Sequence, residues 1–142
     1  MNEKVFQTLR RRGEDEPFAR HLGIRVLEVG KGYALVEMRL EPHNANIFGR
    51  PHGGAIFSLV DEAFEMAGNS HGTVAVALNM NITYIASPSL GAVLQAEARE
   101  QSRSRRTAAY EIRVREDQGR LIAICQALVY RKDDKISFLE QP

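Results

Sequence analysis

The stretch that decides the fold runs from Gly53 to Asn69 and reads GGAIFSLVDEAFEMAGN. Its apolar residues recur at helical spacing, at Ile56, Val60, Ala63 and Ala67. Its polar residues form a second stripe on another side, at Ser58, Glu62, Glu65 and Asn69. Separate apolar and polar stripes with a period of about 3.6 residues are typical of a helix that packs one side on a core. The sequence therefore predicts one long helix, closed by Gly72.

The sequence on either side of this helix has strand patterns. Before it, apolar residues in 24–29 and 34–40 flank a turn at Gly30 and Gly32. After it, strand patterns occupy 74–84, 93–100, 110–114 and 121–130. The last of these is almost continuously apolar, so we expect it to be buried on both faces. Two strands, one long helix and about four strands predict an α+β fold in which a curved antiparallel sheet wraps around the helix.

Length and composition favour one domain over residues 1–142. We expect a helical N-terminal segment at 1–22, with one helix over 2–12 that ends near Gly13 and a helical turn at 17–22. The turn Asp117-Gln118-Gly119 predicts a hairpin. A polar tail at 133–142 is expected to fray, although Ile136, Phe138 and Leu139 can pack.

The charge balance and the cysteine content exclude several classes of protein. The formal net charge is +1, which gives no bulk electrostatic case for binding nucleic acid or a membrane. Cys125 is the only cysteine, which excludes an internal disulfide framework, and its apolar surroundings indicate a core thiol. No stretch approaches the ~20 apolar residues of a membrane span, and the first residues lack the apolar core of a signal peptide. We therefore expect a cytoplasmic protein.

Asp61 is the only charged residue in a third stripe of the long helix, which also holds Phe57, Phe64 and Gly68. Acids on helices are commonly solvated, and Asp61 can be one of these. Alternatively, a half-buried carboxylate in apolar surroundings has a raised proton affinity and can act as a general base or nucleophile. The stripe alone leaves both interpretations open.

The helix begins at His52-Gly53-Gly54. Glycines let a ligand approach the backbone closely, and the unpaired N–H groups of a first helical turn suit the oxyanion of acyl transfer. The same residues can also be a plain glycine-rich helix start. Asp61 follows His52 by nine residues, about half a turn around the helix and ~13 Å along it. The two groups therefore meet on one substrate only if a second copy of the helix lies antiparallel across a two-fold axis.

The run from His43 to Phe64, HNANIFGRPHGGAIFSLVDEAF, resembles the phenylacetic-acid-degradation (PaaI) type of hotdog thioesterase. The resemblance continues through LNMNITY at 78–84 and SPSLG at 87–91 and covers about residues 20–131. It implies a hotdog fold and an acyl-CoA thioesterase that hydrolyses acyl-CoA or aryl-acyl-CoA to the free acid and CoA. It also implies a homo-oligomer, either a dimer or a tetramer formed by two dimers.

The resemblance assigns roles to single residues. Asp61 would be the catalytic carboxylate, as a base or as a nucleophile. The Gly53 N–H would polarise the thioester carbonyl from the neighbouring subunit, and Gly54 would be a substrate-binding residue. His52 would orient the thioester, and Asn46 would hold the water or the carbonyl. No metal or separate cofactor is expected, because a thioester carbonyl is a good electrophile and CoA thiolate a fair leaving group. His21, His43 and His71 also lack metal-ligand spacing.

Further substrate contacts are implied outside the helix. Three arginines, Arg103, Arg105 and Arg106, flank Ser104 in a turn that aligns with the family's CoA-contacting segment. Arginine forks bind phosphates, although a bare run of charges is more often a solvated hairpin. Tyr84 falls at another substrate-contact position, or is simply a strand aromatic. Some relatives have a hydroxyl residue that positions water where this chain has Ala77, a difference that concerns the fine mechanism.

Two other functions remain open beside hydrolysis. One is a hotdog hydratase or dehydratase, which needs a His and an acid around the acyl C2–C3 bond in a different loop pattern. The other is a non-hydrolytic acyl-CoA binding protein. The aromatic residues Phe48, Phe57 and Phe64 can line an acyl pocket or fill the core.

Overall fold

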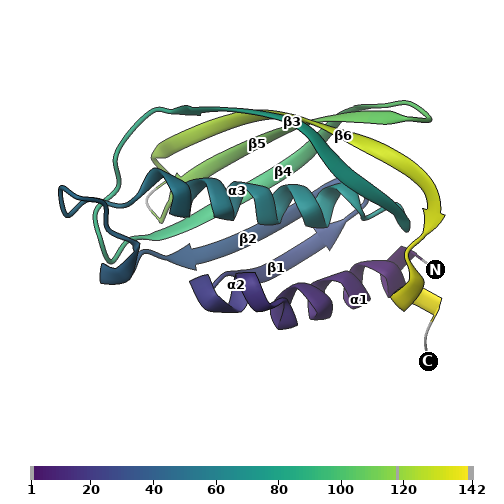
Figure 1. Cartoon of the computed structure of the whole chain (residues 1–142), viewed down its shortest axis with the longest axis horizontal. Coiled ribbons are helices and arrows are strands. Elements are labelled where there is room, and N and C mark those ends of the chain that lie inside the picture. The colour runs from purple at the N-terminus through teal and green to yellow at the C-terminus, as the bar shows by residue number, and fades with distance from the viewer. Residues whose placement is uncertain (1, 118, 141–142) are drawn as a thin grey trace.

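One long helix and a six-stranded antiparallel sheet organise the structure, a computed structural model that describes residues 2–117 and 119–140. The helix, α3, spans Gly53–Gly68 and lies across the curved sheet (Figure 1). The strands are β1 (Arg25–Gly30), β2 (Tyr33–Arg39), β3 (Thr73–Tyr84), β4 (Val93–Arg103), β5 (Thr107–Glu116) and β6 (Leu121–Lys135). Their order in the sheet is β1-β2-β4-β5-β6-β3. This is the α+β arrangement that the sequence predicts.

The apolar stripe of α3 forms the centre of the core. Val60, Ala63 and Ala67 are fully buried, and Ile56 is nearly so. They meet the inward-facing residues of β2, β4 and β5, which are Ala34, Val36, Met38, Leu94, Ala96, Ala98, Tyr110, Ile112 and Val114. The predicted helix is therefore confirmed, but it ends at Gly68 with Asn69 as the C-cap. Gly72, expected to close it, lies in the next turn with a positive φ of 89°.

The N-terminal segment forms two helices, α1 (Asn2–Asp15) and α2 (Pro17–Leu22). The first runs past the predicted end at Gly13, because that residue is buried inside the helix. A Cβ at Gly13 would lie 2.7 Å from Val26 Cγ2, so glycine allows α1 to lie close against β1. In Figure 1 both helices lie beside β1. None of the helices among the described residues is long and apolar enough to span a membrane.

Two expectations for the C-terminal part are wrong. Strand β6 is buried on one face only, since Cys125 and Ala127 are buried whereas Gln126 between them is exposed. The reason is that α3 covers only one face of the sheet. The tail is not frayed over its first residues, because Lys135 pairs with Thr73 in β3. Residues Ser137–Glu140 then form a 3-10 helix, η2. Gln141, Pro142 and the predicted turn residue Gln118 lie outside the described residues.

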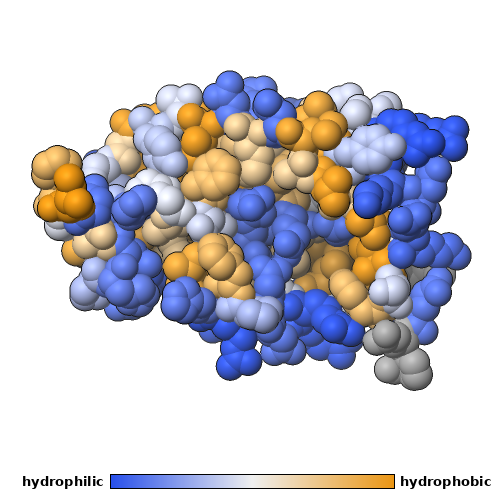
Figure 2. Space-filling model, viewed as in Figure 1, coloured by the Kyte–Doolittle hydropathy of each residue, from blue (hydrophilic) through white to orange (hydrophobic). Residues whose placement is uncertain are grey.

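Strand β3 is an edge of the sheet and carries exposed apolar side chains. Val76 is 42% exposed and Leu78 55%. The loop between β2 and α3, which includes the short 3-10 helix η1 (Pro42–Asn44), is also apolar at its tip, where Ile47 and Phe48 are exposed. Figure 2 shows apolar patches along the part of the surface where β3 runs and at the tip of this loop. An unpaired apolar edge strand is a surface that proteins usually cover.

Candidate active site

His52 is the N-cap of α3 and its ring is held by the helix backbone. The Gly54 N–H donates to His52 Nδ1 at 2.8 Å. Because Nδ1 is the acceptor, the neutral imidazole carries its proton on Nε2, on the exposed side of the ring. The Gly53 N–H has no acceptor among the described residues, as expected for the first turn of a helix. Two donors, the Gly53 N–H and His52 Nε2–H, are thus available at the start of α3.

Tyr84, at the end of β3, contacts the start of α3. Its hydroxyl donates to the Gly53 carbonyl oxygen at 3.0 Å. A Cβ at Gly53 would lie 3.3 Å from the Tyr84 ring, so the ring approaches the backbone as closely as glycine allows. Burial raises the pKa of Tyr84, which keeps the hydroxyl protonated as a donor. The structure thus brings Tyr84 next to Gly53 and His52, although the sequence placed it in a separate segment.

Asn46 organises the loop that precedes α3. Its side-chain oxygen accepts from Phe48 N at 2.9 Å and from Arg50 N at 3.1 Å. This orientation leaves the Nδ2 hydrogens as the donors for a water or a carbonyl oxygen. The sequence analysis missed Asn44, a buried residue whose side chain accepts from Glu41 N at 2.8 Å. The pair Glu41-Pro42, which can begin a short helical turn, precedes Asn44 and is the sequence signal that could have identified it.

Asp61 lies midway along α3 and is exposed in the single chain. Desolvation nonetheless raises its pKa above the ordinary value of 3.8, and the charge of Glu16 adds to the increase. Asp61 forms no hydrogen bond with Asn46, His52 or Gly53 within the described chain. Since α3 is continuous from Gly53 to Gly68, Asp61 points away from His52 by about half a turn. The chain therefore presents the acid and the two donors on opposite sides of one helix.

A basic cavity lies beyond the other end of α3. Its volume is about 530 Å³, and it is lined by Asn2, Phe6, Lys31, Ser70, His71, Thr73, Arg103, Ser104, Arg105 and Arg131. The hairpin arginines differ in their partners. Arg105 lines the cavity and lies 3.5 Å from Asp133, whereas Arg106 reaches the same carboxylate at 3.5 Å without lining the cavity. The Arg131 side chain donates to the Ser104 carbonyl at 2.6 Å, which fixes the hairpin.

A half-buried hydrogen-bond network supports this cavity. Glu100 Oε2 lies 2.6 Å from His71 Nε2 and accepts from the Tyr110 hydroxyl at 2.9 Å. Arg103 contacts both His71 and Glu100. Burial opposes ionisation of Glu100, but the hydrogen bonds from His71 and Tyr110 outweigh it and lower the pKa of Glu100. Burial also lowers the pKa of His71. The sequence analysis missed this network, because it joins residues from β4, β5 and the turn after α3.

The remaining candidates are mostly structural. Phe64 is 2% exposed and meets the Tyr110 ring edge-on at 5.6 Å, so it belongs to the core. Phe57 is half-buried, and Phe48 is 80% exposed in the single chain. Cys125 is fully buried and its pKa is raised by burial, which confirms the predicted core thiol.

Sequence and structure comparisons identify the family. The model of the thioesterase superfamily matches residues 48–123. A putative esterase of Archaeoglobus fulgidus is 42% identical over 113 residues, covering 80% of this chain and 73% of the relative. The acyl-coenzyme A thioesterase PaaI of Escherichia coli is 30% identical over 131 residues, which cover 92% of this chain and 94% of the relative. The solved structure of the E. coli PaaI protein superposes with a TM-score of 0.90 at 29% identity, over 96% of this chain and 99% of that one. The chain therefore belongs to the thioesterase superfamily, as a PaaI-like thioester hydrolase with the hotdog fold.

Proposed function

We propose that this protein hydrolyses the thioester of acyl-CoA or aryl-acyl-CoA, releasing the free acid and CoA. The E. coli relative is named an acyl-coenzyme A thioesterase. The observation that carries the proposal is the start of α3, where the Gly53 N–H has no acceptor and His52 is fixed with Nε2–H outward. Two preorganised donors beside each other suit the oxyanion that forms when a thioester is attacked.

We further propose that each active site combines two copies of the chain. The exposed edge of β3 is long and apolar, and antiparallel pairing with the same edge of a second copy would satisfy its backbone groups. The two α3 helices would then run antiparallel. Asp61 of one copy would then face Gly53 and His52 of the other. This arrangement would bring the acid and the donors together, although they lie on opposite sides of α3 within one chain. Pairs of such dimers can assemble further into tetramers.

The proposed reaction needs only groups of the protein and water. Asp61 accepts a proton from a water molecule that Asn46 orients, and the water oxygen attacks the thioester carbonyl carbon. The oxyanion accepts hydrogen bonds from the Gly53 N–H and His52 Nε2–H of the second copy. The C–S bond then breaks, and the CoA thiolate takes the proton held by Asp61. The raised pKa of Asp61 makes it a stronger base than an ordinary aspartate.

A variant of this reaction uses Asp61 as the nucleophile. Its carboxylate would attack the carbonyl carbon, expel CoA and form a mixed anhydride, which water hydrolyses in a second step. If water attacks the Asp61 carbonyl of this anhydride, an oxygen of solvent water enters Asp61, whereas the base route leaves both Asp61 oxygens unchanged. Single turnover in ¹⁸O-labelled water, followed by mass spectrometry of the peptide that contains Asp61, would establish the nucleophile route by the label in Asp61. Ala77 contributes no hydroxyl to either route.

The basic cavity is our proposed site for the phosphates of CoA. Lys31, Arg103, Arg105 and Arg131 all line it, and arginine forks bind phosphate through paired hydrogen bonds. Asp61 lies about 10 Å along α3 from the end of the helix at Gly68, a distance that an extended phosphopantetheine arm can bridge. A reducing compartment such as the cytoplasm suits this substrate and the unpaired buried thiol of Cys125.

The deciding experiment measures free-thiol release from a panel of aryl-acetyl and medium to long straight-chain acyl-CoAs. Wild type is compared with Asp61→Ala at equal concentration, after size-exclusion chromatography confirms the same oligomer. We expect release by the wild type and a loss of ~10²-fold or more in the variant. Equal rates would exclude Asp61 as the catalytic carboxylate. CoA binding without release would indicate a binding protein, and hydration of an enoyl-CoA with the thioester intact would indicate a hydratase.

A further inference from the structure

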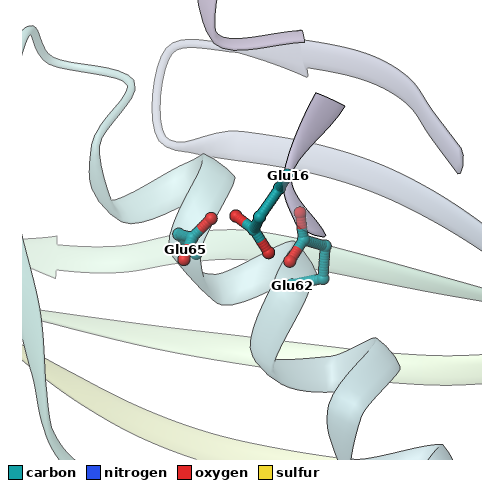
Figure 3. Close-up of side chains that lie close together, drawn as sticks. All are labelled: Glu16, Glu62 and Glu65. Atoms are coloured by element: carbon teal, nitrogen blue, oxygen red, sulfur yellow. The ribbon is translucent and has the colours of Figure 1, made fainter. Parts of the chain in front are cut away.

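Three glutamates from two segments of the chain converge beside α3 (Figure 3). Glu62 and Glu65 belong to the polar stripe of α3, and Glu16 precedes α2. One carboxylate oxygen from each lies within 4.8 Å of those of the other two. Figure 3 shows the Glu16 carboxylate between the other two. We call these three residues the glutamate cluster.

Within the described residues, the buried member of the cluster, Glu62, has an unpartnered carboxylate oxygen. Glu62 is 4% exposed, and its Oε2 is buried without a hydrogen-bond partner. None of the ion pairs between described side chains includes Glu16, Glu62 or Glu65. A buried carboxylate oxygen without a partner is costly, and nearby like charges add to the cost. A bound cation is one partner that would satisfy this oxygen and offset the repulsion between the three acids.

The side chain of Glu16 lies in the glutamate cluster and does not cap its own helix, α2. Glu16 occupies the N-cap position of α2, but its side chain makes no cap hydrogen bond there. An acid at an N-cap ordinarily accepts from the first-turn N–H groups of its helix. Here the carboxylate reaches α3 instead, so the cluster links the α1–α2 segment to the central helix.

The spacing of the oxygens fits a hard divalent cation. Three carboxylate oxygens that all lie within 4.8 Å of one another can contact a single cation. Ca²⁺ takes more oxygen ligands in a more flexible geometry, whereas Mg²⁺ demands a near-ideal octahedron and keeps several of its waters. A neighbouring cavity of about 500 Å³ is lined by Glu16, Glu65, Asp15 and Asn69 among others. It gives an entry path and room for water to complete the coordination. Arg12 also lines it, with its guanidinium 4.5 Å from the Phe138 ring centroid.

We propose that Glu16, Glu62 and Glu65 form a binding site for a divalent cation, with Ca²⁺ preferred over Mg²⁺, that fastens the α1–α2 segment to α3. The site has a structural role and takes no part in the proposed hydrolysis. The spacing of the histidines relative to carboxylates and cysteines does not predict this site, because the three acids are glutamates and Glu16 is distant in sequence from the other two.

The test uses the full-length protein, treated with EDTA and then dialysed. CaCl₂ or MgCl₂ is titrated at constant ionic strength, while calorimetry measures binding and scanning fluorimetry measures the melting temperature. We expect saturable Ca²⁺ binding that is tighter than Mg²⁺ binding, and a Tm that rises with the logarithm of the cation concentration. Glu62→Gln keeps the shape of the buried side chain, and Glu16→Gln changes a more exposed one. Both are expected to weaken Ca²⁺ binding by at least about tenfold.

The matched control is Glu3→Gln, which removes an exposed acid of α1 that lies outside both the cluster and the neighbouring cavity. It should bind Ca²⁺ within about twofold of the wild type, because surface charge alone contributes little. The proposal is overturned if the folded wild type shows no saturable binding. It is also overturned if Glu62→Gln responds to Ca²⁺ as the wild type does, or if Glu3→Gln loses the response to the same extent as Glu16→Gln.

Discussion

At the scale of single residues, His52 has two separate tasks, one for each ring nitrogen. Nδ1 accepts the Gly54 N–H and caps α3, and Nε2–H is proposed to contact the oxyanion. Loss of an N-cap acceptor costs about 1 kcal/mol of stability. We therefore expect His52→Ala to lower both the free energy of unfolding, by about 1 kcal/mol, and kcat.

His52→Asn separates these tasks, because asparagine is a good N-cap but does not reach as far as the imidazole Nε2. Its free energy of unfolding, measured by urea titration, should remain within about 0.5 kcal/mol of the wild type, while its kcat falls as in His52→Ala. A His52→Asn enzyme with the kcat of the wild type would refute the role of Nε2.

At the scale of elements, the hairpin of β4 and β5 depends on Glu100. This residue contacts His71, Arg103 and Tyr110 at once, so it orients an arginine that lines the basic cavity. We expect Glu100→Gln to raise KM for acyl-CoA severalfold and to change kcat little, because the thioester end lies elsewhere. Steady-state kinetics measure both constants.

Glu97→Gln is the control for the hairpin. Glu97 is on the same strand but binds Tyr33 and Arg99, away from the cavity. Its KM should match that of the wild type. A lower kcat with unchanged KM in Glu100→Gln would contradict a role in CoA binding.

The contact between α3 and the α1–α2 segment should depend on pH. Burial, together with the nearby Glu16, raises the pKa of Glu62 and Glu65 above the ordinary value of 4.5. Acids with a raised folded pKa favour the folded state most below their unfolded pKa, and this contribution is lost as pH rises through the folded pKa. Between about pH 5 and 8, with a chelator present, the wild type should therefore lose stability relative to Glu62→Gln.

Urea titrations of both proteins at each pH measure this difference. The comparison between variants removes the opposite contribution of His71, whose lowered pKa favours the folded state as pH rises through 6.5. Parallel stability curves for the two proteins would show that Glu62 does not keep a proton in the folded state. Saturating Ca²⁺ should reduce the difference, because the cation replaces the proton.

Local sequence patterns predicted the helices and strands well, but they did not predict which other segments cover them. The period of α3 and the alternation in β5 determine which residues face the core, so Val60 and Ile112 were placed correctly. The burial of Glu62 and the open face of β6 depend on which other segment covers them, and no local period carries that information. The same holds for the proposed site: the helix stripe and the family resemblance selected Asp61, Gly53 and His52 as candidates, whereas the Glu100 network required the fold.

At the scale of the whole molecule, we propose that each chain contributes part of two active sites. The edge strand β3 exposes Val76 and Leu78, and α3 presents Asp61 on the side opposite His52. The two-fold dimer that we propose through β3 would account for both facts, because two sheets would join into one and each acid would face the donors of the other chain. In that dimer, pairing of the two β3 strands would also complete both proposed sites.

Subunit complementation tests this arrangement directly. In a mixed dimer of Asp61→Asn and His52→Ala chains, one site combines both substitutions, while the other combines an intact Asp61 with an intact His52. Co-expression with two affinity tags isolates this mixed dimer, which should have about half the activity of the wild type, and a random mixture should have about a quarter. Each variant alone should remain nearly inactive. If acid and donors came from the same chain, every site in the mixed dimer would lack one of them, and no activity would return.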